Sequence, residues 1–220
     1  MRTDESDAIV KELVSGSHKL YLFFGGMAGG LGIPQFEFMR FSRSIEENKI
    51  FVRDMSQYWY QTGASGNRKN IYELRDYLRK QIDEINPQDV YFIGNSMGGY
   101  AAILFGCMLD VGEIHAFSPQ TFISPYNRFY AKDFRWSRQV LSTYYKSLFR
   151  PHIYDLRKCM PLKRNRLINI YVSNADKLDC KHANHISNYP YVKVHVYEKG
   201  GHELVSHLRD TGKLAEIFSQ

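Results

Sequence analysis

Short apolar runs alternate with amphipathic stretches over most of the chain. The apolar runs are rich in β-branched and aromatic residues, which is typical of buried strands. We predict strands at 19–24, 50–52, 90–93, 114–117, 167–172 and 192–197. Apolar side chains recur at helical spacing in the intervening stretches, which indicates helices with one buried face. We predict these helices at 36–47, 70–85, 97–109, 138–149 and 203–218.

Near-continuous apolar strands separated by amphipathic helices indicate a parallel sheet that is covered on both faces. We therefore predict an α/β fold: a doubly wound, mostly parallel sheet of about six strands with helices on both faces. The 220 residues fit one domain over 1–220. The segment 118–161 interrupts the alternation, because it is rich in Tyr, Phe, Arg and Pro and has no strand pattern. Such a segment is a lid or binding insert, or else an ordinary surface crossover with one helix.

A serine flanked by glycines follows the predicted strand 90–93. The stretch Gly94-Asn95-Ser96-Met97-Gly98 matches G-x-S-x-G, the tight strand-to-helix turn that lifts a serine above the carboxyl end of a sheet. The turn requires small residues two positions before and two positions after the serine. A helix N-cap is the alternative role for Ser96, but capping does not require those glycines. The pattern predicts a nucleophile.

A serine nucleophile needs a base and a group that orients the base. His202 lies in a glycine-rich loop after the last predicted strand, where the base is expected, and His207 is the weaker alternative. The acid is expected after the preceding strand, where Asp176 lies four residues and Asp179 seven residues past the strand. We favour Asp176 by its distance from the strand, and expect the other aspartate to cap the helix that follows.

An oxyanion hole needs two converging N–H groups. The backbone amide of Met97 is one, and the other is expected from Gly25, Gly26 or Met27, in the glycine-rich loop after the first strand. A phosphate-binding loop is excluded, since the loop contains neither G-x-G-x-x-G nor GK[ST].

Several polar and aromatic residues follow other strands at the same end of the sheet. Trp59 and Tyr60 are predicted to bind substrate by stacking on a sugar ring, with a core position as the alternative for Trp59, and Gln120 is a further substrate-binding candidate. His182 and His185 share a helix face but have no further ligand in a metal-binding spacing, so we predict helix surface residues and no metal.

Composition excludes several classes of protein. With 44% hydrophobic residues the chain can bury a full core, and its net charge of +6 favours anionic partners. An arginine-rich arm and zinc-finger spacing are both absent from the sequence, so nucleic-acid binding is not expected. Three widely spaced cysteines indicate a reducing compartment. The acidic N-terminus lacks a signal-peptide pattern and no membrane span is expected, so the predicted location is cytoplasmic. The oligomeric state is left open.

The ordered set of Gly94 to Gly98, then Asp176 or Asp179, then His202 resembles the α/β-hydrolase superfamily over residues 19–218. The chain has no room for the two leading strands of the full fold, so a reduced sheet is expected. Leu178-Asp179-x-x-His182-Ala183 and the Trp59-Tyr60 loop are similar to short esterase-like proteins of bacterial polysaccharide gene clusters.

The resemblance implies a serine-nucleophile acyl-transfer enzyme acting on a small-molecule ester or a glycan. The first expectation is an esterase that uses a Ser-His-Asp triad. The alternatives are an O-acetyltransferase that moves an acetyl group from acetyl-CoA to a sugar hydroxyl of a bacterial polysaccharide, and a non-catalytic binding protein on the same fold. No cofactor is expected apart from acetyl-CoA as the co-substrate of a transferase.

Overall fold

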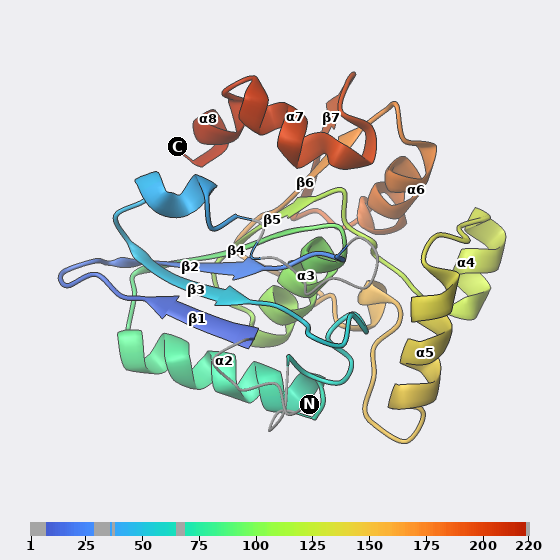
Figure 1. The fold of residues 1–220 in the computed structure, drawn as a ribbon, viewed down its shortest axis with the longest axis horizontal. Helices are drawn as coiled ribbons and strands as arrows, with labels where there is room; N and C mark the ends of the chain where they lie inside the picture. Colours follow the sequence, from blue (N-terminus) through green and yellow to red (C-terminus); the bar gives the residue numbers. More distant parts are fainter. Residues whose placement is uncertain (1–7, 29–35, 37, 65–68, 219–220) are drawn as a thin grey trace.

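A seven-stranded sheet forms the centre of the molecule (Figure 1). The computed structural model describes residues 8–28, 36, 38–64 and 69–218. The strand order is β1-β3-β2-β4-β5-β6-β7, and all neighbours are parallel except β1, which pairs antiparallel with β3. The strands are β1 (Ile9–Glu12), β2 (Lys19–Phe24), β3 (Asn48–Val52), β4 (Asp89–Asn95), β5 (Glu113–Phe117), β6 (Ile168–Ser173) and β7 (Val192–Tyr197).

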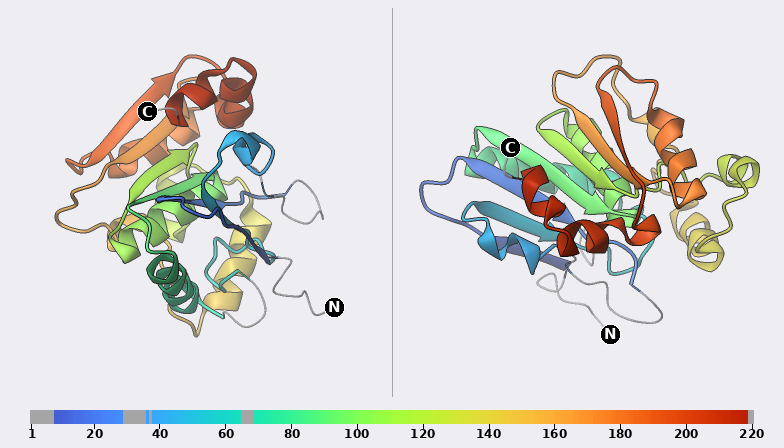
Figure 2. Two further views of the ribbon diagram at one scale, coloured as in Figure 1. Left: turned by 90° about the vertical axis from the view of Figure 1, so that its left-hand side faces the viewer. Right: turned by 90° about the horizontal axis from the view of Figure 1, so that it is seen from above.

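Helices cover both faces of this sheet, which confirms the predicted α/β class. Alternate residues of the strands contribute to two separate apolar clusters, one on each face. The first cluster includes α2 (Ile71–Ile85), α3 (Met97–Leu109) and α6 (Lys177–Ile186), and the second includes α7 (Leu204–Asp210) and α8 (Lys213–Phe218). Figure 2 shows α7 and α8 on the opposite side of the sheet from α2 and α3.

Outside the segment 118–161, the structure differs from the prediction at three elements. The sheet has a seventh strand, β1, which was missed because it is short and only one of its residues is buried. In place of a helix over 36–47, the described residues hold one short 3-10 helix, η1 (Phe41–Ser44), while position 37 lies outside them. The terminal helix predicted over 203–218 is divided into η3 (Gly201–Glu203), α7 and α8, and Gly212 separates the last two at a φ of +77°.

The segment 118–161 leaves the sheet after β5 and is hereafter called the insert. It contains α4 (Pro125–Ala131), α5 (Ser137–Ser147) and the short helix η2 (Leu156–Lys158), so the helix predicted over 138–149 is present. In Figures 1 and 2, α4 and α5 project from the body of the molecule beside α6. Among the helices of the described residues, none has the length and apolar character needed to cross a bilayer.

Candidate active site

Ser96 lies at a strained turn between β4 and α3. Its backbone has φ 53° and ψ −116°, a conformation that a residue with a side chain rarely adopts. A Cβ on Gly94 would lie 2.1 Å from the carbonyl oxygen of Gly98, and a Cβ on Gly98 would lie 2.1 Å from that of Phe24. Both glycines are therefore required by close backbone contacts, as the elbow pattern predicts.

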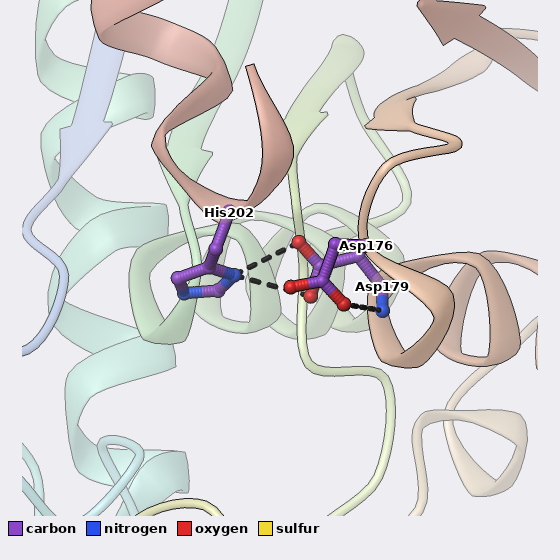
Figure 3. Close-up of side chains that lie close together, drawn as sticks. All are labelled: Asp176, Asp179 and His202. Carbon is purple, nitrogen blue, oxygen red and sulfur yellow. Dashed lines mark hydrogen bonds and ion pairs between the residues drawn. The ribbon is translucent and has the colours of Figure 1, made fainter. Parts of the chain in front are cut away.

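His202 connects this serine to a carboxylate. It lies in η3, after β7, and its Nε2 is 3.0 Å from the Oγ of Ser96. On the other side of the ring, Nδ1 lies 2.8 Å and 3.1 Å from the two carboxylate oxygens of Asp179 (Figure 3). When Nδ1–H donates to Asp179, Nε2 is left as the acceptor for the serine hydroxyl. This is the hydrogen-bond order that a serine nucleophile requires.

The acid beside His202 is Asp179, and the preference for Asp176 was wrong. Asp176 is the N-cap of α6: its carboxylate accepts from the backbone N–H of Leu178 at 2.9 Å and of Asp179 at 3.0 Å. Asp179 lies in the first turn of α6, fully buried, with its carboxylate directed at the His202 ring. Distance from the strand was a poor criterion, because the helix turn determines which carboxylate faces the histidine.

A guanidinium from the insert also contacts the carboxylate of Asp179. Arg135 donates from one terminal nitrogen to Asp179 at 2.8 Å, and from its other nitrogens to Asp133 at 3.0 and 3.1 Å. Asp133 in turn accepts from Nε2–H of His182 at 2.9 Å. The backbone N–H of Thr121 donates to the other ring nitrogen of His182 at 3.1 Å, which fixes the tautomer.

The sequence did not indicate Arg135 or Asp133, and it placed His182 and His185 on the surface. His182 is almost completely buried and His185 contacts Asp155 at 2.8 Å, so the surface assignment was wrong for both. The only signal in the sequence was their spacing, which puts two histidines on one face of α6. Their carboxylate partners lie in the insert and are distant along the chain.

Burial and charge act in opposite directions on the two titrating groups. Burial raises the pKa of Asp179, but the hydrogen bonds and charges of His202 and Arg135 outweigh it, and the pKa lies below its ordinary value. Burial lowers the pKa of His202, but the hydrogen bond and charge of Asp179 outweigh it, and the pKa lies above its ordinary value. Arg135 opposes that rise through its positive charge. Asp179 therefore stays ionised, and His202 is a stronger base than an isolated histidine.

The glycine loop after β2 lies against the elbow, as the contact between Gly98 and Phe24 requires. Of the three residues predicted to supply the second oxyanion donor, Gly25 is excluded, because its N–H already donates to the carbonyl of Val52 at 2.8 Å. Gly26 and Met27 remain. The N–H of Met97 is the first of α3, and the first N–H groups of a helix have no intrahelical acceptor.

Trp59, Tyr60 and Gln120 do not present surfaces for a sugar, so the predicted substrate-binding role was wrong for all three. Each is at most 1% exposed. The indole N–H of Trp59 donates to the Gln120 side chain at 2.8 Å, and the Tyr60 hydroxyl lies 2.9 Å from the carbonyl oxygen of Gly25. These side chains form the interior support of the site, with Tyr60 holding the glycine loop.

Asp176, Asp179 and His202 have ligand atoms within 4.8 Å of one another, a spacing that could suit a metal ion (Figure 3). The guanidinium of Arg135 lies 2.8 Å from Asp179 and 3.8 Å from Asp176, so a positive charge is already placed between these carboxylates. His202 Nδ1 also faces Asp179 directly. The group fits a hydrogen-bonded histidine better than a cation site.

Comparison with known proteins gives structural relatives only. The chain matches neither a protein-family model nor a curated protein sequence. It is similar to the capsule O-acetyltransferase of Neisseria meningitidis serogroup A, with a TM-score of 0.70 and 14% identity over 94% of this chain and 89% of that one. A variant of the same enzyme solved in complex with CoA has a TM-score of 0.68 at 14% identity, over 94% and 90% of the two chains.

Two further structures are also similar. MGS-M2, an α/β hydrolase from a Medee basin deep-sea metagenome library, has a TM-score of 0.63 at 11% identity, over 96% of this chain and 94% of that one. MenH from Staphylococcus aureus has a TM-score of 0.60 at 12% identity, over 96% of both chains. Identities this low establish architecture alone. The chain has the α/β-hydrolase fold, with Ser96, Asp179 and His202 brought together at the carboxyl ends of its strands.

Proposed function

We propose that this protein is a serine-dependent acyl-transfer enzyme whose primary activity is hydrolysis of a carboxylic ester. One observation carries the proposal: an unbroken hydrogen-bond chain from Ser96 through His202 to a fully buried Asp179. A serine that only caps a helix needs neither the strained turn nor a histidine held by a carboxylate.

The chemistry follows from these atoms. Ser96 Oγ attacks the ester carbonyl carbon as His202 Nε2 takes the hydroxyl proton, and Asp179 stabilises the resulting imidazolium. The tetrahedral intermediate collapses, its bond to the alcohol oxygen breaks, and His202 returns the proton to that oxygen. Water then loses a proton to His202 and attacks the acyl carbon, the bond from that carbon to Ser96 Oγ breaks, and His202 returns the proton to Oγ as the acid leaves.

The negative oxygen of the intermediate is assigned to the N–H of Met97 and the N–H of Gly26. The carbonyl of Gly25 points at the Tyr60 hydroxyl in the interior. In a trans peptide the following N–H points the opposite way, so Gly26 N–H is directed away from Tyr60. Two such donors are the minimum for an oxyanion hole.

A second candidate function is favoured by the structural neighbours. The N. meningitidis protein is a capsule O-acetyltransferase, and one of its structures holds CoA. In this chain, acetyl-CoA would then acylate Ser96 and a sugar hydroxyl of a bacterial polysaccharide would replace water as the acceptor. The same hydrogen-bond chain serves both reactions, and the net charge of +6 suits an anionic acceptor.

The deciding experiment measures turnover of p-nitrophenyl acetate and butyrate by the wild type, Ser96→Ala, His202→Ala and the control His207→Gln. We expect loss of turnover in the first two variants and retention in the third. Acetyl-CoA with acidic glycan acceptors, assayed for O-acetyl product, separates transfer from hydrolysis. A folded wild-type protein that turns over no donor and is not labelled by a fluorophosphonate would contradict the proposal and leave a binding protein.

A further inference from the structure

The net charge of the insert equals the net charge of the whole protein. Residues 118–161, all of them described, contain eight Lys and Arg residues and two Asp residues, a net charge of +6. The net charge of the entire chain is also +6, so the remaining residues are neutral in sum. Both acidic residues, Asp133 and Asp155, are buried and ion-paired. The surface of the insert therefore presents cations without carboxylates, among them Lys132, Arg138, Lys146 and Arg150.

The same surface is strongly apolar. Six side chains of α4, α5 and the turn between them form what we call the insert patch: Tyr126, Phe129, Tyr130, Phe134, Leu141 and Tyr145. Each is between 64% and 77% exposed. Isolated exposed apolar residues are normal on a protein, but a contiguous group of this kind marks an interaction surface.

Ring contacts and a shared hollow show that the insert patch is contiguous. The ring centroids of Tyr126 and Tyr130 are 4.5 Å apart, and those of Tyr130 and Phe129 are 5.7 Å apart. Phe129, Phe134 and Leu141 line one hollow of about 270 Å³ between α4 and α5. Tyr145 follows Leu141 by one helical turn, with the Lys146 ammonium 5.7 Å from its ring.

Helix α5 has two apolar faces. The face that belongs to the insert patch is not the face that packs against the body of the molecule. Val140, Thr143 and Ser147 of α5 are buried against the body. Leu141 and Tyr145 lie on its opposite side, and Leu148 continues the same stripe at 60% exposure. Beyond it, Phe149 is 95% exposed. A helix with a second apolar stripe facing solvent has more apolar surface than its own packing uses.

We propose that the insert patch docks the protein on an anionic phospholipid bilayer. The insert exposes aromatic and aliphatic side chains together with Lys and Arg, and no carboxylate of its own is exposed, which matches the chemistry of a negatively charged membrane surface. Apolar side chains enter the boundary between headgroups and acyl chains, and the basic residues pair with phosphates. The projection of α4 and α5 from the body leaves them free to meet a flat surface (Figures 1 and 2).

Charge and side-chain chemistry disfavour two other occupants. A second copy of the chain would bring two cationic surfaces together, which costs free energy. An acidic glycan would pair with the basic residues, but the Phe and Leu side chains of the patch have no hydrogen-bonding group for its hydroxyls. Burial of those side chains against the acyl chains of a bilayer removes their apolar surface from water and is favourable.

The test is sedimentation of the full chain with phosphatidylcholine vesicles that contain or lack 30% phosphatidylglycerol. We expect binding to the anionic vesicles, weakened by salt, and little binding to the neutral ones. Phe129→Ser with Leu141→Ser should reduce binding more than about tenfold. Arg138→Gln with Lys146→Gln should reduce it by about fivefold for each charge removed.

Leu162→Ser and Lys80→Gln are the matched controls, because both side chains are highly exposed and lie outside the insert patch. Circular dichroism and thermal unfolding check that each variant is folded. The proposal is overturned by a wild type that does not bind anionic vesicles at low salt, or by patch variants that bind as the controls do. It is also overturned if the patch variants instead abolish binding to an acidic polysaccharide, or abolish a concentration-dependent dimer seen by sedimentation.

Discussion

The insert contains two turns with the same local chemistry and different surroundings. In Asp133-Phe134-Arg135 and in Asp155-Leu156-Arg157, the aspartate accepts from the backbone N–H and the guanidinium of the arginine two residues later. Each aspartate also contacts a histidine of α6: His182 at 2.9 Å in the first turn and His185 at 2.8 Å in the second.

The difference lies in what each arginine reaches beyond its own aspartate. Arg135 is 21% exposed and donates to Asp179, the carboxylate that holds His202. Arg157 is 49% exposed, and its guanidinium donates to both carboxylate oxygens of Asp155. The turn at Asp155 thus only attaches the insert to α6. The turn at Asp133 attaches the insert and also supports the proposed triad through Arg135. The role of each turn is therefore determined by the residue that its arginine contacts, and not by the short sequence motif itself.

The largest effect is expected from the two carboxylates that the arginines contact: Asp179, which Arg135 reaches, and Asp155, which Arg157 reaches. Asp179→Asn keeps the shape of the side chain but removes the charge that orients His202, and should lower turnover by about 10⁴-fold. Asp155→Asn removes the carboxylate that contacts Arg157 and His185, neither of which contacts His202, and should leave turnover near the wild-type value, at a cost in thermal stability. Comparable losses of kcat/KM in the two folded variants would contradict the distinction.

A smaller effect is expected for the arginines themselves. Arg135→Gln leaves Asp179 without its guanidinium, and the resulting misplacement of His202 should lower kcat by about 100-fold, with KM little changed. Arg157→Gln breaks a half-exposed pair and should change kcat by less than about twofold. Steady-state kinetics on both variants tests this comparison. Equal kcat values for the two would show that Arg135, like Arg157, only attaches the insert.

The pH dependence separates the charge of Arg135 from its role in positioning. His202 acts as a base only when neutral, and its pKa is raised above 6.5, so activity should rise with pH through that higher pKa. The groups that act on its pKa are Asp179, Asp176 and Arg135, of which only Arg135 lowers it. Arg135→Gln should therefore move the acid limb of kcat/KM to higher pH. The pH dependence of fluorophosphonate labelling measures the same limb without a substrate, and an unmoved limb would contradict the charge effect.

The smallest effect is expected at the aspartate that caps α6. Asp176→Ala removes the acceptor for two N–H groups and should cost about 1 kcal/mol in the free energy of unfolding. Turnover should stay within about threefold of the wild type, because Asp176 contacts His202 neither directly nor through Arg135 at hydrogen-bond distance. Urea unfolding and a p-nitrophenyl ester assay provide the two measurements. A loss as large as that of Asp179→Asn would restore Asp176 as the acid.

The sequence predicted those features that depend on neighbours along the chain. The elbow at Ser96 is written in five consecutive residues, and the strands follow from short apolar runs. The position of His202 after the last strand followed from chain order. The choice of Asp179 depended on which face of the first helical turn meets a ring 23 residues later. The burial of Trp59 and the contacts of Arg135 depend on residues still further away, 61 and 44 positions along the chain.

The contacts of the insert with α6 have a consequence for the proposed base. Moving the insert away from α6 would separate Asp133 from His182 and, in the same movement, Arg135 from Asp179. Asp179 would then hold His202 without the guanidinium that contacts it in the structure. The position of the insert and the support of the histidine are therefore coupled, so a change on the outer segment of the molecule can be felt at Ser96 through two side chains.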